Sequence, residues 1–156
     1  MFVRIALASV LLVSIVATGS TTARAAANIV GHFSSVVVGG PECLSPIGLC
    51  TRGTLSGGLK GEFFFTATSL VPTADTSTTG VVLYTGDIVL TTKDGTLTCK
   101  DAGGFQTVGA GAVASVCGIV AGTGRLAGAS GTIQFVGTFT VADGGDGDYR
   151  ASVSLP

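Results

Sequence analysis

The chain has 156 residues, enough for one domain, and 46% of them are hydrophobic while only 11% are charged. The charges almost cancel, at a formal net charge of −1, and no basic cluster occurs, which argues against a nucleic-acid or anionic-membrane partner. The 25 glycines and the many threonines disfavour helices and favour strands joined by tight turns.

The first 25 residues have the layout of a secretory signal peptide. Arg4 gives a basic start, residues 5–16 are apolar except for two serines, and Ala23-Arg24-Ala25 offers a cleavage site, with cleavage after Ala27 as the alternative. The apolar run is short for a membrane span. Loss of Arg4 and Arg24 leaves six basic and nine acidic residues, a net charge of −3. We therefore predict a secreted protein, extracellular or periplasmic, with one domain over residues 28–156.

Eight short segments have the composition or the alternation of β-strands, and nothing after the signal peptide predicts a helix. They cover residues 28–38, 51–59, 61–70, 80–92, 96–105, 111–120, 132–141 and 148–155. Alternation is clearest in the seventh segment, where Ile133, Phe135 and Phe139 share one face. Many short strands separated by turn signals predict an all-β sandwich or barrel.

A hairpin is predicted at Asp94-Gly95, a strong two-residue turn signal. A turn at these two residues places Leu90 opposite Cys99. The apolar residues Ile88, Leu90, Leu97 and Cys99 then share one face, so the turn and the hydrophobic pattern agree.

All four cysteines follow the signal peptide, and an even number in a secreted domain predicts two disulfides. Of the three connectivities, we favour Cys43–Cys50 and Cys99–Cys117. The first would close the loop over residues 41–50, which has no other device to order it. The second follows if Phe105 pairs with Gly111, because Cys99 then lies directly opposite Cys117, within disulfide range.

Three patterns that suggest a cofactor or metal have a simpler explanation. Gly122-x-Gly124-x-x-Ala127 fits a dinucleotide-binding pattern, but alternating sequence follows where a helix is required. Asp143, Asp146 and Asp148 lack the spacing of a calcium loop and suit a turn. His32 is the one histidine, too few for a zinc site. We expect no metal site and no cofactor.

The spacing of the carboxylates indicates no catalytic pair. Those considered are Glu42, Glu62, Asp87 and Asp101. We expect each to be solvated at a strand end or turn. Asp87 lies within a strand near Tyr84, and its pKa would rise through desolvation if it faced a barrel interior.

Several glycine-rich segments resemble, in order, the allene oxide cyclase barrel-like and dirigent family, most closely the secreted bacterial-type members of the former. The segments are Gly53–Phe63, Tyr84–Asp87, Lys93–Gly95, Lys100–Phe105, Ile119–Gly131 and Gly137–Thr140 with Gly147–Tyr149. The resemblance covers roughly residues 50–155 and implies an eight-stranded antiparallel barrel with an interior cavity. Plant members of the wider group steer cyclisation or radical coupling of apolar substrates. Their catalytic residues have no residue-by-residue match here.

We therefore expect a secreted small barrel that binds a small apolar molecule or acts as a structural module, with no catalytic residues. The residues expected to line a cavity are Phe63, Phe65, Tyr84, Asp87, Phe135 and Phe139. For the aromatic ones we favour the simpler interpretation, an ordinary core. The alternative is a cyclase- or dirigent-type enzyme, which needs an ionisable residue in the cavity, with Glu62, Asp87 and Arg125 as candidates. An interaction module with an exposed aromatic patch at Phe64 is a third reading. Barrels of this group often form trimers, but the sequence itself does not indicate a homo-oligomer.

Overall fold

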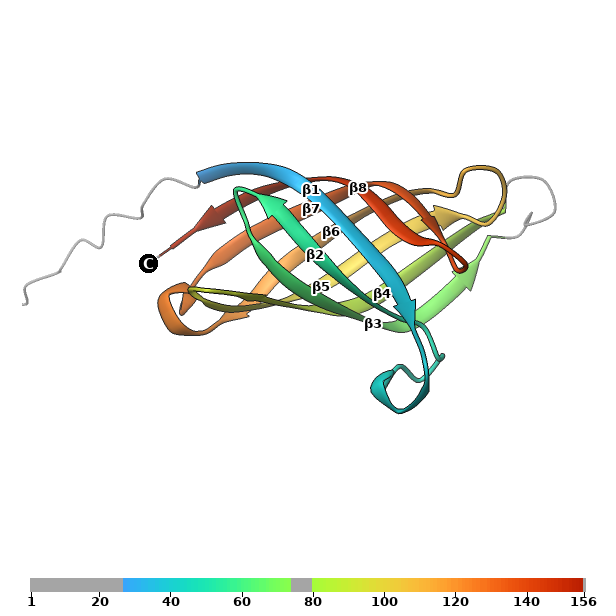
Figure 1. The fold of residues 1–156 in the computed structure, drawn as a ribbon, viewed down its shortest axis with the longest axis horizontal. Coiled ribbons are helices and arrows are strands. Elements are labelled where there is room, and N and C mark those ends of the chain that lie inside the picture. Colours follow the sequence, from blue (N-terminus) through green and yellow to red (C-terminus); the bar gives the residue numbers. More distant parts are fainter. Residues whose placement is uncertain (1–26, 74–79, 156) are drawn as a thin grey trace, which may run out of the picture.

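Alternating apolar and polar residues form eight antiparallel strands in the computed structural model, which describes residues 27–73 and 80–155. The strands follow one another in chain order, and β8 pairs with β1, so the sheet is a closed barrel (Figure 1). The predicted eight-stranded antiparallel barrel is confirmed. The predicted signal peptide lies outside the described residues. The strands are β1 (Ala27–Val38), β2 (Cys50–Gly57), β3 (Gly61–Pro72), β4 (Val81–Thr92), β5 (Gly95–Gln106), β6 (Ala112–Gly122), β7 (Ser130–Thr140) and β8 (Gly144–Ser154).

Two 3-10 turns interrupt the connections: η1 (Gly40–Glu42) lies between β1 and β2, and η2 (Gly124–Leu126) lies between β6 and β7. The β1–β2 connection projects from the barrel wall (Figure 1). The glycine pattern at Gly122 and Gly124 joins two strands, as predicted, and the N–H of Arg125 donates to the carbonyl of Asp94, 2.8 Å away. None of the helices in the described ranges has the length and apolar character to span a bilayer.

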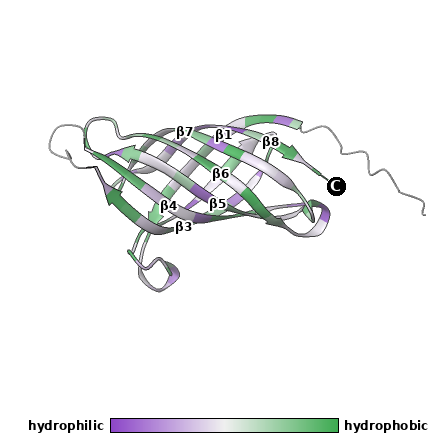
Figure 2. Ribbon diagram, turned by 180° about the vertical axis from the view of Figure 1, so that it is seen from behind, coloured by the Kyte–Doolittle hydropathy of each residue, from purple (hydrophilic) through white to green (hydrophobic). Residues whose placement is uncertain are grey.

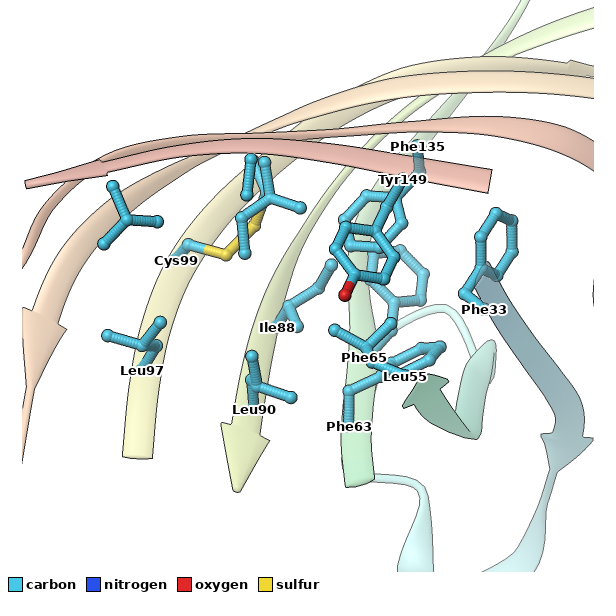
Figure 3. Packing of buried hydrophobic residues seen from close by; sticks show 14 of the residues in the cluster. Phe33, Leu55, Phe63, Phe65, Ile88, Leu90, Leu97, Cys99, Phe135 and Tyr149 are labelled. Atoms are coloured by element: carbon cyan, nitrogen blue, oxygen red, sulfur yellow. A yellow bond between two sulfur atoms is a disulfide. The ribbon is translucent and has the colours of Figure 1, made fainter. Parts of the chain in front are cut away.

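The two ends of the barrel differ in their filling. The end formed by the β2–β3, β4–β5 and β6–β7 connections is the closed end, and the end formed by the other connections is the open end. Apolar residues and polar residues alternate along the strands (Figure 2), and the inner ones pack tightly toward the closed end. Residues at most 1% exposed there include Ile133, and also Leu90, Leu97 and Tyr149, which Figure 3 shows.

Tyr149 closes this end with its hydroxyl. The ring lies among Leu55, Phe63 and Phe135 in the core (Figure 3). The hydroxyl accepts from the N–H of Leu59 at 2.7 Å and lies 2.9 Å from the carbonyl oxygens of Ser56 and Leu59, either of which can accept its single proton. One side chain from β8 thus satisfies backbone groups of the β2–β3 turn.

Both predicted disulfides are present, Cys43–Cys50 and Cys99–Cys117. The predicted register behind the second is wrong. Cys117 lies opposite Asp101, and Cys99 lies opposite Ile119, so the bond joins a diagonal pair with Cα atoms 5.6 Å apart. The offset begins at the β5–β6 connection, where Phe105 pairs with Val113 rather than with Gly111.

The predicted hairpin register is also wrong by two residues. Thr92 pairs with Gly95, so the turn residues are Lys93 and Asp94, and Leu90 lies opposite Leu97 rather than Cys99. The Thr92 hydroxyl explains the choice, because it accepts from the N–H of Asp94 at 3.1 Å and donates to the carbonyl of Gly95 at 3.0 Å. A shift of two keeps every residue on its predicted face.

Replacing Tyr149 with phenylalanine tests the closure. Tyr149→Phe keeps the ring and removes the hydroxyl that serves Leu59 and Ser56. We expect the free energy of unfolding in urea to fall by about 1–3 kcal/mol, as for an unsatisfied buried hydrogen-bonding group. Tyr84→Phe, at the other tyrosine, is the control and should change stability less. Equal stability of Tyr149→Phe and the parent chain would contradict the closure.

Candidate functional site

A cavity lies inside the barrel toward the open end. Its volume is about 70 Å³, and most of its lining is apolar. That volume holds about two waters, and it is less than half of the ~150 Å³ that accommodates benzene in an apolar protein cavity. The lining residues are Phe33, Ser35, Leu49, Thr51, Phe63, Phe65, Tyr84, Ile88, Asp101, Phe105, Val113, Ser115, Phe135, Phe139 and Gly145. The open half therefore admits slender groups, whereas the closed half is filled.

Most of the residues expected from the sequence to line a cavity do so. They are Phe63, Phe65, Tyr84, Phe135 and Phe139. Asp87 does not, which corrects the expectation: it lies on the outer face and pairs with the ammonium of Lys100. Side chains alternate between the two faces of a strand. Ile88 and Leu90 on the same strand are buried inside the barrel, so Asp87 faces outward.

Aromatic rings pack edge to face around the cavity. Phe65 and Tyr84 have ring centroids 5.5 Å apart, and Phe105 and Phe139 have centroids 5.2 Å apart, both pairs T-shaped. Phe33 meets Phe135 in the same way at 5.5 Å. Such pairs hold each other in place, so the cavity wall is largely preformed.

Asp101 is the ionisable residue whose location was predicted wrongly from the sequence. It lies on β5 between the inward residues Cys99 and Phe105 and is only 4% exposed. The expectation of a solvated carboxylate is therefore wrong. The signal that would have found it is the period-two pattern of β5, which puts Asp101 on the same face as Cys99.

Two glycines make room beside Asp101. Gly86 lies opposite Asp101, and a Cβ there would stand 2.3 Å from a ring carbon of Phe65. Gly103 separates Tyr84 from Ser115 in the next row, and a Cβ there would stand 2.5 Å from the Cβ of Ser115. Side chains at these glycines would displace the groups that line the cavity.

Burial raises the pKa of Asp101, and the hydroxyls of Ser115 and Tyr84 and the N–H of Ala102 partly oppose this rise. Burial, and then the charge of Asp101, raises the pKa of Tyr84. Despite these neighbours, Oδ1 of Asp101 is buried without a hydrogen-bond partner among residues 27–73 and 80–155. Asp101 also lines the cavity, so a bound molecule could approach its carboxyl group.

Every lysine and arginine in the described ranges is exposed on the outside of the barrel. They are Arg52, Lys60, Lys93, Lys100, Arg125 and Arg150. Three of them pair with outer acids, Arg52 with Glu42, Lys100 with Asp87 and Arg125 with Asp94. Asp101 thus has no cationic partner in the part of the chain that the structure describes.

His32 lies on the outer face between two acids of β8. Its Nε2 is 3.1 Å from Oδ2 of Asp146, and its Nδ1 is 3.4 Å from Oδ1 of Asp148. These contacts raise the pKa of His32 above 6.5, that of Asp146 contributing most. In the described ranges, no three histidine, cysteine or acidic side chains are grouped so that they could hold a metal ion.

No protein-family model and no curated protein matches this chain. The eight-stranded barrel that the family resemblance implies is present.

Asparagine at position 101 tests the buried carboxyl. Since the folded-state pKa of Asp101 is raised above 3.8, folding binds its proton more tightly, and the parent chain loses stability as pH rises from about 3.8 through the folded pKa. Asp101→Asn removes this loss, so its stability relative to the parent should be greater at pH 7 than at pH 3 in urea unfolding. Asp87→Asn, on the outer face, is the control. A difference independent of pH would contradict a buried Asp101.

The pKa of His32 can be measured by NMR without ambiguity, because it is the one histidine of the chain. We expect a value above 6.5 that falls in both Asp146→Asn and Asp148→Asn, more in the former. The sign follows from linkage: the contribution of protonated His32 to stability is present below 6.5 and is lost as pH rises through the folded pKa. A titration at or below 6.5 in the parent chain would contradict the observed contacts.

Proposed function

We propose that this secreted barrel binds a small apolar molecule in its open half without transforming it. The observation that carries the proposal is the half-filled interior: a cavity lined by aromatic rings lies toward the open end, while side chains fill the closed end. A barrel that served only as a structural module would gain stability by filling both halves, because empty space forfeits packing energy.

The geometry restricts the ligand. A cavity of about 70 Å³ accepts the end of a slender chain more readily than a fused ring system. Phe139 and Leu49, both only partly buried, line the cavity together with the buried rings. A molecule therefore enters from the open end and leaves any longer part near the loops.

The proposal also includes the location of the protein outside the cytoplasm and its family. Two disulfides are consistent with folding in an oxidising compartment outside the cytoplasm. The closed eight-stranded barrel with an interior cavity supports placement with the allene oxide cyclase barrel-like proteins, since that is the fold the resemblance implies.

An enzyme of the cyclase or dirigent type is the second candidate, and one observation favours it. Asp101 lines the cavity beside Tyr84 and could donate or accept a proton there. The residues that the sequence suggested for this role lie outside: Asp87 pairs with Lys100, the side chain of Arg125 is 85% exposed, and Glu62 is exposed.

Filling the cavity tests the proposal. Val113 lines it from β6, whereas Val116 on the same strand faces solvent and is 48% exposed. We expect n-pentane and n-butanol to shift the methyl NMR signals of Ile88 and Val113 in the parent chain. Val113→Phe should abolish binding, and the matched control Val116→Phe should retain it. Absence of binding in the parent, or equal binding in both variants, would contradict the proposal.

Recovery of the bound molecule separates the two candidates. A ligand that elutes unchanged after prolonged incubation supports binding alone. A ligand that the parent chain converts, and that Asp101→Asn leaves intact, supports the enzyme.

A further inference from the structure

Asp101 is a buried residue whose carboxyl group has an oxygen without a hydrogen-bond partner among the described residues. The residue is 4% exposed, and this oxygen is Oδ1. A buried carboxyl of this kind is costly in either form: the ionised form lacks a counter-charge, and the neutral form leaves an oxygen unsatisfied. Because every described lysine and arginine is exposed on the outside, none of these side chains supplies a counter-charge to the carboxylate.

The groups around the carboxyl also present negative partial charges. The hydroxyls of Ser115 and Tyr84 lie beside it, and that of Thr51 lines the same cavity, so three further oxygens can accept hydrogen bonds. The remaining lining is mainly aromatic, and the face of an aromatic ring is negative. A group with several donors and a positive charge complements this set, whereas a carbonyl or carboxylate does not.

We propose that the ligand is a slender primary amine, bound as its ammonium ion, with the nitrogen at the carboxyl group of Asp101 and the alkyl chain directed to the open end. An ammonium has three donors, which the carboxylate and two hydroxyls can satisfy, and it is small enough for the narrow cavity. This inference rests on the proposed binding function and names the class of its ligand.

The pH dependence follows from the groups that face Asp101. Tyr84 on β4 is the titratable neighbour, β6 contributes Ser115 and the disulfide-bonded Cys117, and Asp87 and Lys100 point outward to each other. The ammonium needs an ionised Asp101, and burial raises the pKa of this carboxyl. Amine affinity therefore rises with pH through the pKa of Asp101 in the free protein and then levels off while the amine stays protonated.

Three isosteres test the inference: n-butylamine, n-butanol and n-pentane, titrated into the parent chain at pH 5 and pH 8 by methyl NMR. We expect butylamine to bind at pH 8 about ten- to hundredfold more tightly than butanol, the range for a hydrogen bond to a charged group. The preference should shrink as the pH is lowered through the pKa of Asp101, while butanol affinity stays constant.

Asp101→Asn is the decisive variant. It should bind butanol as the parent does and lose the preference for butylamine, and Asp87→Asn should retain that preference. Ser115→Ala should weaken butylamine binding less than Asp101→Asn, which keeps the test open if the latter folds poorly. If butanol and pentane bind but butylamine binds no better at either pH, the amine assignment is overturned and the proposed function stands. If none of the three binds, the proposed function fails with it.

Discussion

Every inward-facing position of a closed eight-stranded barrel competes for the same narrow interior. Because side chains alternate strictly between the two faces, no residue can leave the interior without a change of register. The closed end resolves this competition with large apolar residues and the hydroxyl of Tyr149. The open end resolves it differently, with glycines such as Gly86 and Gly103 next to aromatic rings. The cavity is the direct result of that difference.

Asp101 shows that stability alone does not explain the open half. An unsatisfied buried polar group costs about 1–3 kcal/mol, a substantial share of the stability of a small domain. A small apolar residue would remove that cost, and an asparagine would remove the charge. A preorganised and already desolvated carboxyl is useful only if something binds to it, since folding has then met part of the cost of binding.

Much of the fold follows from the sequence because its signals are local. Alternation in residues 132–141 predicts β7, and the even number of cysteines, taken with the predicted secretion, predicts the presence of two disulfides. One register error arises where the Thr92 hydroxyl selects the hairpin turn, and the other arises at the β5–β6 connection, where Phe105 pairs with Val113 rather than with Gly111. The site was harder to predict. Polarity suggested that Asp101 is solvated, but alternation with Cys99 prevails, and the missing partner of Oδ1 depends on groups from other strands.

The filled end of the barrel also gives any guest a direction. A molecule cannot thread through, so its leading group meets the polar cluster first and its trailing part stays near the loops. Recognition is then strict for the shape and charge of one terminus and permissive for the length behind it. A barrel of this kind would select molecules by their terminal group. It would bind all members of a homologous series that share that group and differ only in chain length.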